Sequence, residues 1–581
     1  MMFVGKGADS IEDMLSGYVH ANAELVALRE GAVVRREGTP AGHVAVVAGG
    51  GGGHYPGFAG WVGAGMLDAA VSGQIFSSPS AAQIHRAALA VENGGGVLLA
   101  YLNYSGDRIH FGEAARQLRA EGIAVEEVVI ADDIASRTSR EVADGRGIAG
   151  ALFVCKVLGA AAAEGRGLEE VAHLGTRAAE RTVSLGAAVS GCTLPGDSEP
   201  LFTVEKGQLA IGLGIHGEPG LETQEQGTPS DLARRLVAAT LDYEPEAGHG
   251  GYEGRLAVLV NSLGGCSHEE LFVLYARVRE ELATSGQEIV APVVGEQLTS
   301  LDMVGASLST MFLDADLEAL WSAPVRTASL RRETLPTADE QSAGTVAAGA
   351  DAPVQASRAQ QELAARARAA IGAAAEAVAQ HEERLAQLDR VGGDGDHGRG
   401  MVRGLAAAHE AATSATEAGA AVGAVVRAAG AAWSDKAGGT SGALWGAALE
   451  AFASALGDVR PPTDAELVDG LTRARDAIVE LGGARPGDKT MVDAIEPFVQ
   501  VFEAEPDAPF AQTLVRATAV AEAAAEATAD LVATKGRART HGTRTIGTPD
   551  AGAVSFGIVA RAVAESLQHD PAAAPAGEPT S

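Results

Sequence analysis

Cysteine, aromatic residues and positive charge are all scarce in this chain. Its 581 residues include three cysteines, 4% aromatic residues, and 44 Lys and Arg against 76 Asp and Glu. Cys155, Cys192 and Cys266 form no CxxC pair and no disulfide framework, so each is expected to be a small buried residue in a reducing compartment. The formal net charge of −32 argues against nucleic acid or an anionic membrane as the main partner.

Long hydrophobic runs are also missing. No apolar run is long enough to span a bilayer, and the amino-terminal segment lacks a basic region followed by an apolar core. We therefore expect a cytoplasmic protein without a membrane partner. The hydrophobic fraction of 46% is typical of a globular chain, and 581 residues exceed what one hydrophobic core supports. Two or more domains are expected.

The first half of the chain alternates strand-like and helix-like segments. Short apolar runs occur at residues 43–48, 97–102, 125–130, 255–260 and 288–294. Each is followed by Gly, Asp or Asn and then by a helical pattern, which predicts an α/β domain with a mixed or largely parallel sheet over residues 1–325. Ligands of such folds bind beyond the carboxyl ends of the strands.

The composition then changes twice. Residues 326–358 are rich in Ala, Thr, Gly, Pro and Asp without apolar periodicity, which indicates a flexible linker. Residues 359–570 follow a helical pattern almost throughout and predict an all-α helical bundle, with residues 571–581 as a tail. One helical face of this half is predicted to carry Ile371, Ala375, Val378, Leu385 and Leu388.

Polar residues gather after three strands of the predicted α/β domain. Five glycines and His54 follow the strand at 43–48, Asp107 follows the strand at 97–102, and His216 lies between glycines. Glycines let backbone N–H groups approach a ligand closely, although a tight turn with a chance histidine fits the first segment equally well. Two histidines and an aspartate at strand ends suggest acid–base chemistry on a small polar substrate.

Three carboxylates end a predicted helix in the second half. Asp394 and Asp396 are separated by one glycine, and Asp389 closes the preceding helix. Convergent carboxylates repel one another unless a hard cation such as Mg²⁺ neutralises them, and such sites bridge phosphates. The alternative is a solvated acidic turn.

Two later segments have the pattern of anion sites at helix starts. Thr440 and Ser441 precede a predicted helix, and Thr490 with Asp493 resembles a capping box. Each could equally be an ordinary N-cap. A basic cluster around Arg537 could face phosphate or water.

These motifs resemble those of the dihydroxyacetone kinase family. GGGGGHYPGFAG, NYSGDR and GIHGEPG are similar to its substrate domain, and GGDGDHG, GGTSGALWG, PGDKTM and GTPDAGA are similar to its nucleotide domain. The resemblance covers nearly the whole chain, in the domain order of the single-chain, ATP-dependent members. It implies phosphorylation of a short ketose by ATP, and a homodimer.

The resemblance also implies roles for residues of the first half. His216 would bond covalently to the substrate carbonyl as a hemiaminal. Substrate would be bound by Gly51, Gly52, Gly53, His54 and Asp107, with Asp107 and His54 assisting deprotonation of the attacking hydroxyl. A covalent anchor of this kind selects ketoses over polyols, which lack an electrophilic carbon.

For the second half, the resemblance implies a magnesium and ATP site. Asp389, Asp394 and Asp396 would bind Mg²⁺ on the ATP phosphates. The nucleotide would be lined by His397, Gly398, Arg399, Gly400, Thr440, Ser441, Gly482, Thr490, Met491, Arg537, Asp550, Ala551 and Gly552. Transfer would be direct, so positioning and charge neutralisation would carry most of the catalysis.

Three positions depart from the family pattern. Tyr55 replaces a glutamate, Leu102 replaces a lysine, and Ala551 replaces a proline that we expect to matter little. The first two changes lie beside the substrate turn, so we interpret them as altered substrate choice, toward erythrulose. Alternatives are cyclisation of FAD to a cyclic flavin nucleotide, a non-ATP system that receives phosphate from a carrier protein, and a non-catalytic regulatory protein.

Overall fold

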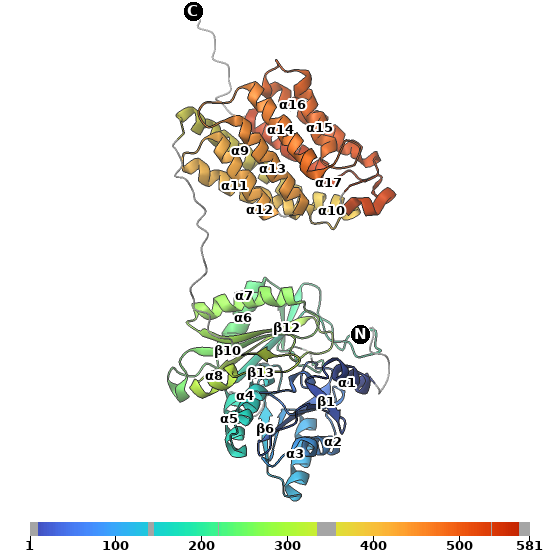
Figure 1. Cartoon of the computed structure of the whole chain (residues 1–581), viewed down its shortest axis with the longest axis vertical. Helices are drawn as coiled ribbons and strands as arrows, with labels where there is room; N and C mark the ends of the chain where they lie inside the picture. The colour runs from blue at the N-terminus through green and yellow to red at the C-terminus, as the bar shows by residue number, and fades with distance from the viewer. Residues whose placement is uncertain are drawn as a thin grey trace, which may run out of the picture. The chain divides into compact units, whose positions relative to one another are not determined.

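The computed structural model describes residues 10–137, 145–218, 220–333, 356–437, 439–535 and 537–568. The side chains of Arg537 and Thr540 are outside this description. The chain divides into two compact units, Met1–Ser342 and Ala343–Ser581. The first contains both helices and strands, and the described part of the second is helical throughout (Figure 1).

The first unit contains two six-stranded sheets. The first sheet has the order β1-β2-β4-β3-β5-β6, and its strands are β1 (Val26–Arg29), β2 (Ala32–Arg35), β3 (Ala45–Gly52), β4 (Ala69–Ile75), β5 (Val97–Leu102) and β6 (Val125–Ile130). Strands β4, β3, β5 and β6 are parallel, and β1 and β2 are antiparallel to their neighbours.

The second sheet has the order β11-β10-β12-β7-β8-β9. Its strands are β7 (Thr182–Ala188), β8 (Gln208–Ile211), β9 (Glu222–Glu225), β10 (Arg255–Ser262), β11 (Glu288–Gly295) and β12 (Gly305–Phe312). Only the β10–β11 pair is parallel. Both sheets are mixed, so the predicted α/β class is confirmed, and each apolar run of the sequence forms a strand.

Helices cover the sheets. They are α1 (Ser10–Ala21), α2 (Ala81–Val91), α3 (Ser105–Ala120), α4 (Ala151–Ala163), α5 (Leu168–Glu180), α6 (Pro229–Leu241), α7 (His268–Thr284) and α8 (Ala315–Ser322). Helix α4 is apolar apart from Lys156, whose Nζ donates a hydrogen bond to the Leu320 carbonyl oxygen, and nearly all of the helix is buried, as expected of a core helix. Its residues share one hydrophobic core with residues of both sheets, so the two sheets are tied into one unit.

The glycine run differs from its predicted role as a turn. Strand β3 continues through the run to Gly52, and the chain turns only at Gly53, where φ is +95°. A Cβ on Gly49 would lie 2.3 Å from the Val71 carbonyl oxygen on β4, and one on Gly51 would lie 2.8 Å from the Ser77 amide nitrogen. The glycines therefore let β3 pack closely against neighbouring backbone.

The predicted linker begins too early. Residues 326–333 belong to the first unit, because β13 (Val325–Arg326) pairs with β14 (Arg331–Arg332), and Ser329 donates a hydrogen bond from Oγ to the Gly60 carbonyl oxygen. Composition alone missed this short hairpin. The linker residues 334–355 lie outside the described part of the chain, as does the predicted tail at 571–581.

The second unit is all-α in its described part, as predicted. Its helices are α9 (Arg358–Gln380), α10 (Glu382–Gly392), α11 (His397–Glu417), α12 (Val422–Ala437), α13 (Gly439–Leu456), α14 (Asp464–Gly482), α15 (Val492–Ala504), α16 (Phe510–Ala527) and α17 (Ala551–Gln568). The predicted apolar face lies at or against the core, where Val378 and Leu385 are fully buried.

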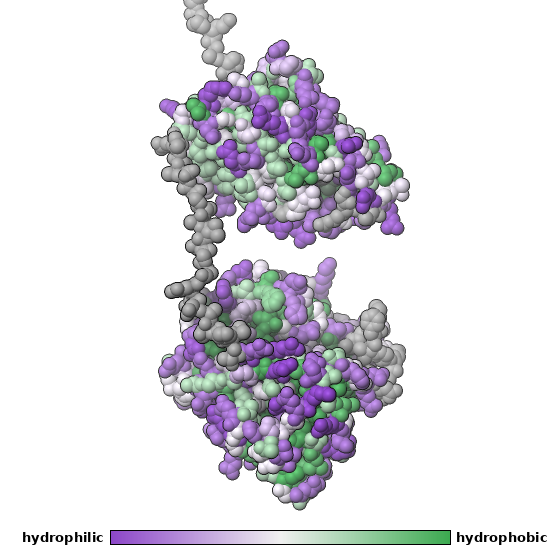
Figure 2. Space-filling model, in the orientation of Figure 1, coloured by the Kyte–Doolittle hydropathy of each residue, from purple (hydrophilic) through white to green (hydrophobic). Residues whose placement is uncertain are grey.

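The surface is mixed in composition, and two of the three cysteines are buried as expected. Hydrophilic and hydrophobic side chains are interspersed over the visible face of both units (Figure 2). Among the described helices, none combines the length and hydropathy that crossing a membrane requires. Cys155 and Cys192 are buried and Cys266 is half-buried, and all three are free thiols.

Candidate active site

His54 is held by a backbone contact that fixes its tautomer. Its Nδ1 lies 2.8 Å from the Thr299 carbonyl oxygen, which can only accept, so Nδ1 carries the hydrogen and Nε2 keeps a lone pair. Nε2 is buried without a hydrogen-bond partner among the described residues. Burial, together with the nearby His216, lowers the pKa of His54 to about 3, so the ring is neutral at physiological pH and Nε2 can accept a hydrogen bond.

Asp107 lies in the first turn of α3, just beyond β5, and is buried. Its Oδ1 has no hydrogen-bond partner among the described residues. Burial raises the pKa of Asp107 from 3.8 to about 6, against the opposing effects of a Ser78 hydrogen bond and of His216. A Cβ on Gly50 would lie 3.9 Å from Asp107 Oδ2, which places the carboxyl beside the glycines of β3.

His216 follows β8 and is surrounded by aromatic rings. Its ring centroid is 4.8 Å from that of His54, 4.4 Å from that of Tyr104 and 5.2 Å from that of Phe76, all in edge-on geometry. The side chain remains 20% exposed, so the ring is fixed in place yet reachable by a small molecule. The structure thus brings together His54, Asp107 and His216 from three distant segments, as the sequence predicted.

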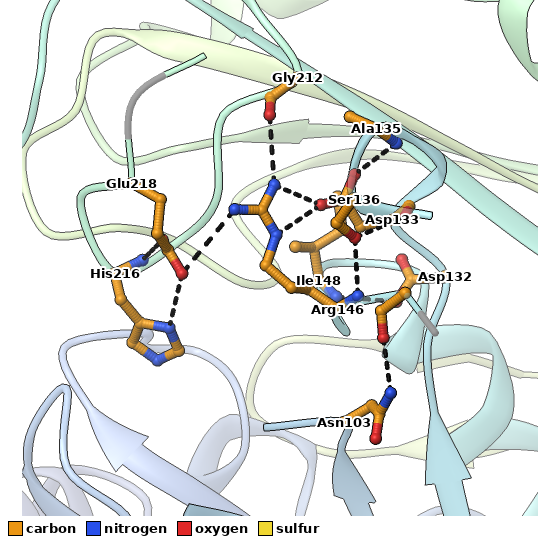
Figure 3. A network of polar contacts seen from close by, with 11 residues as sticks. Asn103, Asp132, Asp133, Ala135, Ser136, Arg146, Ile148, Gly212, His216 and Glu218 are labelled. Atoms are coloured by element: carbon orange, nitrogen blue, oxygen red, sulfur yellow. Dashed lines mark hydrogen bonds and ion pairs between the residues drawn. The ribbon is translucent and has the colours of Figure 1, made fainter. Parts of the chain in front are cut away.

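Glu218 contacts His216 twice. The Glu218 carboxylate accepts a hydrogen bond of 2.8 Å from the His216 backbone amide, and its other oxygen lies 3.7 Å from His216 Nδ1 (Figure 3). Burial opposes ionisation, but the hydrogen bonds from His216 lower the pKa of Glu218 to about 2. A carboxylate facing Nδ1 favours a hydrogen on that nitrogen, which leaves the Nε2 lone pair free.

Several of these contacts were not predicted. Glu218 and Tyr104 stand inside the motifs that were singled out, so the signal was there and the assignment was missed. Phe76 and Thr299 lie in segments without a motif, and only folding brings them to His54. Tyr104 adds a further buried hydroxyl without a partner among the described residues, and burial raises its pKa well above the usual value.

Gly51, Gly52 and Gly53 have packing roles in the structure. A Cβ on Gly52 would lie 2.4 Å from the Ile11 side chain, and one on Gly53 would meet Leu301 and Phe76. These glycines are needed to fold the strand end, and their contact with substrate stays a prediction.

Most of the predicted nucleotide residues line a cavity of about 350 Å³ in the helical unit. It is lined by Asp389, Asp394, Asp396, His397, Gly400, Thr440, Ser441, Gly482, Thr490, Met491, Asp550, Ala551 and Gly552 among others. One carboxylate oxygen from each of Asp389, Asp394 and Asp396 lies within 4.8 Å of the other two. Oxygen donors so grouped fit a hard divalent cation.

Backbone contacts order this acidic turn. Asp389 Oδ2 accepts hydrogen bonds from the Gly395 amide at 2.8 Å and from the His397 amide at 3.4 Å. His397 contacts Ser555 Oγ on α17 through Nε2 at 2.9 Å. Asp394 and Asp396 are exposed, so they are open to an ion and its water ligands.

Gly398 and Arg399 do not line the cavity. A Cβ on Gly398 would lie 2.3 Å from the Glu382 carbonyl oxygen, so this glycine lets α11 pack against the start of α10. Arg399 is exposed on α11. The side chain of Arg537 lies outside the described residues.

Thr440 and Ser441 lie in the first turn of α13, which begins at Gly439 and so includes residues that the sequence placed before the helix. Lys489, not among the predicted site residues, also lines the cavity and has a positive φ of +61°. Its Nζ donates to the carbonyl oxygens of Leu531 at 3.0 Å and Thr545 at 2.6 Å, which fixes the following Thr490 at the cavity.

The two departures near the substrate turn differ in setting. Tyr55 is 42% exposed beside His54 and contacts the Tyr18 ring edge-on. Leu102 is 2% exposed in the core at the end of β5, where it packs against Gly147. Tyr55 is therefore accessible to a bound molecule, whereas Leu102 acts through packing.

Two domain families match the two halves of the chain. The Dak1 domain matches residues 16–329 and the DAK2 domain matches residues 391–565. Two proteins of Mycolicibacterium smegmatis are each 46% identical over 96% of this chain: an L-erythrulose 1-kinase, matched over 98% of its length, and a D-erythrulose kinase, matched over 97%. The triokinase/FMN cyclase of Homo sapiens is 33% identical over 97% of this chain and 99% of its own.

A solved structure has the same architecture. The dihydroxyacetone kinase from C. freundii, in complex with AMP-PNP and Mg²⁺, aligns over 97% of this chain and 99% of its own, with a TM-score of 0.58 and 30% identity. The match spans both units. With a Dak1 domain, a DAK2 domain and full-length relatives of this kind, the chain belongs to the dihydroxyacetone kinase family.

Proposed function

We propose that this protein is a kinase that transfers the γ-phosphoryl group of ATP to a short ketose, erythrulose or dihydroxyacetone. The observation that carries the proposal is the group around His216: an imidazole with Nδ1 facing Glu218, next to a neutral His54 and a buried Asp107. The names of the relatives and the AMP-PNP complex of the related structure support both the class of reaction and the co-substrate.

The ketone explains why a free imidazole nitrogen is needed. The Nε2 lone pair of His216 attacks the carbonyl carbon, and the C=O π electrons move to oxygen. The new oxyanion takes a proton from solvent and the ring, now bonded through Nε2, releases its Nδ1 proton, so one proton moves in net from Nδ1 to oxygen and a neutral hemiaminal results. A polyol has no electrophilic carbon and cannot form this bond. The substrate is thereby selected and oriented through one covalent contact in a small site.

His54 and Asp107 supply the proton acceptors for transfer. The attacking hydroxyl of the anchored ketose loses its proton to this pair, and its oxygen attacks the γ-phosphorus of ATP, with ADP as the leaving group. The unpartnered His54 Nε2 and Asp107 Oδ1 support this role, because buried acceptors without protein partners are suited to a substrate hydroxyl.

Asp389, Asp394 and Asp396 would hold Mg²⁺ beside the nucleotide cavity. Bound there, the ion would neutralise charge on the phosphates. The remaining lining residues would hold the nucleotide by backbone amides at the first turns of α11, α13 and α17, where helix N-termini favour anions.

Erythrulose is the preferred substrate in this proposal. It differs from dihydroxyacetone by one additional hydroxymethylene group, and Tyr55 offers an exposed ring and hydroxyl next to His54. The relatives named for L- and D-erythrulose are equally similar to this chain, so the choice of enantiomer is an outcome of the assay. The homodimer and the cytoplasmic location stay predictions of the sequence.

The test is ADP release by the purified chain with ATP and Mg²⁺. Substrates would be dihydroxyacetone, D- and L-erythrulose, glyceraldehyde and glycerol, with a no-substrate control. We expect turnover on a ketose, with no turnover on glycerol. Turnover on none of them would refute the kinase proposal. FAD with Mn²⁺ would then test flavin cyclisation, an activity named for the human relative.

A further inference from the structure

Arg146 lies on the side of Glu218 opposite His216. Its Nη1 is 3.9 Å from Glu218 Oε1, the same oxygen that is 3.7 Å from His216 Nδ1 (Figure 3). One carboxylate oxygen therefore faces a guanidinium on one side and an imidazole on the other. The second oxygen is already occupied by the His216 backbone amide.

Arg146 is itself fixed by buried groups. Its Nε and Nη2 donate to Asp133 Oδ2 at 2.9 and 2.7 Å, and its Nη2 donates to the Gly212 carbonyl oxygen at 3.2 Å. The Asp133 side chain is fully buried and accepts a further hydrogen bond from the Ala135 amide. The guanidinium is thus tied to the segment after β6, in the first sheet, and to the residue that follows β8, in the second sheet.

The backbone around this arginine is equally constrained. The Arg146 amide donates to Ser136 Oγ at 2.7 Å, and its carbonyl oxygen accepts from the Asp133 amide at 3.0 Å. Asp132 accepts from the amides of Ile148 at 2.7 Å and Gly150 at 2.8 Å. So many contacts within one short segment leave the side chain of Arg146 little freedom.

We propose that Arg146, anchored by Asp133, is a positioning residue that holds Glu218 against His216 Nδ1 and so keeps the Nε2 lone pair of His216 free for the ketone carbonyl. This inference deepens the proposed function and rests on it. His216 itself is the only member of the set that contacts substrate.

The charge of Arg146 is as important as its place. The guanidinium attracts the same carboxylate oxygen that faces the imidazole, so its charge helps to hold that oxygen beside Nδ1. The other ionisable groups that face His216 are His54, Asp107 and Tyr104, and none of them is a cation in its neutral-pH form.

The test compares Arg146→Met with Arg146→Lys and with Arg181→Met. Arg181 is the matched control, because it is comparably buried and is paired to Asp314 at 3.2 Å. It lies between α5 and β7, and no contact to Glu218 is found for it among the described residues. Three quantities are measured: the dissociation constant for dihydroxyacetone without ATP, the KM for ATP, and the imidazole ¹⁵N spectrum of histidine-labelled full-length protein. The His216 signals are assigned with His216→Ala.

We expect Arg146→Met to weaken dihydroxyacetone binding by about tenfold or more, the size expected for loss of a partly buried charge contact, while the KM for ATP is unchanged. The His216 ¹⁵N signals should lose the pattern of a single Nδ1–H tautomer. Arg146→Lys should retain much of the wild-type affinity for dihydroxyacetone and much of the wild-type His216 spectrum. Arg181→Met should change neither the affinity nor the spectrum.

Wild-type binding and an unchanged His216 spectrum in Arg146→Met would overturn the inference. If Arg146→Met does not fold, Glu218→Gln is measured in its place: a wild-type His216 spectrum there overturns the inference, and a mixed-tautomer spectrum supports it. The spectrum does not depend on turnover, so a wild-type chain that releases no ADP would refute the proposed function without deciding the role of Arg146.

Discussion

At the scale of single residues, the candidate substrate site combines buried groups whose ionisation is made costly by the fold. Asp107 and His54 are both buried beside β3, and each retains an atom without a hydrogen-bond partner among the described residues. Such an arrangement reduces stability, and proteins tolerate it where the free atoms meet a ligand. The loss of folding stability caused by burying these groups should therefore be measurable separately from activity.

Asp107→Asn tests that cost through its pH dependence. The folded pKa of Asp107 is raised from 3.8 to about 6, so the folded state holds a proton that the unfolded state has lost, and stability falls as pH rises through this interval. Asparagine removes the effect. The stability of Asp107→Asn relative to wild type should increase by on the order of 2 kcal/mol between about pH 4 and pH 7, while activity is lost.

Urea denaturation at both pH values measures this difference. The same substitution at the exposed Asp197 serves as the control and should leave the pH dependence of stability unchanged. A relative stability of Asp107→Asn that is the same at both pH values would contradict the assigned burial cost.

Substitutions of His54 and His216 should differ in their effects on ketose binding and on kcat. His54→Asn keeps a donor for the Thr299 carbonyl oxygen but removes the proton acceptor, so kcat should fall by about 10²-fold or more, the usual size of a general-base contribution, with ketose binding largely retained. His216→Ala should lose both. Isothermal titration with the ketose, alongside steady-state kinetics, distinguishes these outcomes, and equal loss of binding in both variants would argue against separate roles.

At the scale of helices and strands, hydropathy predicted the strands that stand out as apolar runs in the sequence. Strands β5 and β6 were found with correct bounds: β5 is a continuous apolar run, and β6 has two glutamates among its valines. Several other strands were missed, among them β7 and β12. Strands β7 and β12 carry buried small polar residues, and Ser184 and Ser309 hydrogen-bond to each other across this pair at 2.6 Å. A polar pair satisfied only after folding leaves no hydropathy signal. In the same way, Glu218 was visible in a motif, while its partner Arg146 was not.

Glycines on α11 give a matched test of helix packing. Gly398→Ala would put a Cβ 2.3 Å from the Glu382 carbonyl oxygen, whereas at Gly400 the nearest atom is 3.7 Å away. We expect Gly398→Ala to destabilise the protein by roughly 1–3 kcal/mol through overpacking, and to weaken ATP binding by moving the acidic turn. Gly400→Ala should be neutral or slightly stabilising, because alanine favours helices by about 0.5–1 kcal/mol. Chemical denaturation of both variants measures the difference, and equal stabilities would contradict this account of the packing.

At the scale of the whole molecule, the reaction is divided between two units with separate cores. The group around His216 belongs entirely to the α/β unit, and the acidic turn with its cavity belongs entirely to the helical unit. A substitution in the acidic turn should therefore leave ketose binding unchanged, and a substitution near His216 should leave ATP binding unchanged.

Asp396→Asn tests this independence and the metal assignment together. Removing one of three clustered carboxylates should raise the Mg²⁺ concentration needed for half-maximal turnover by about tenfold, the scale of losing one ion contact, with ketose binding unchanged. Asp435→Asn, an exposed acidic residue on α12 that is absent from the cavity lining, should have no effect. Turnover of Asp396→Asn at wild-type Mg²⁺ concentrations would refute the metal assignment.

The most direct test of the account is ¹³C NMR of carbonyl-labelled dihydroxyacetone bound to the full-length chain without ATP. The account predicts that wild-type protein converts the ketone carbon to an sp³ carbon bonded to nitrogen, and that His216→Ala leaves it a ketone. A bound ketone signal in the wild type, or the same sp³ signal in His216→Ala, would contradict the claim that His216 captures the carbonyl.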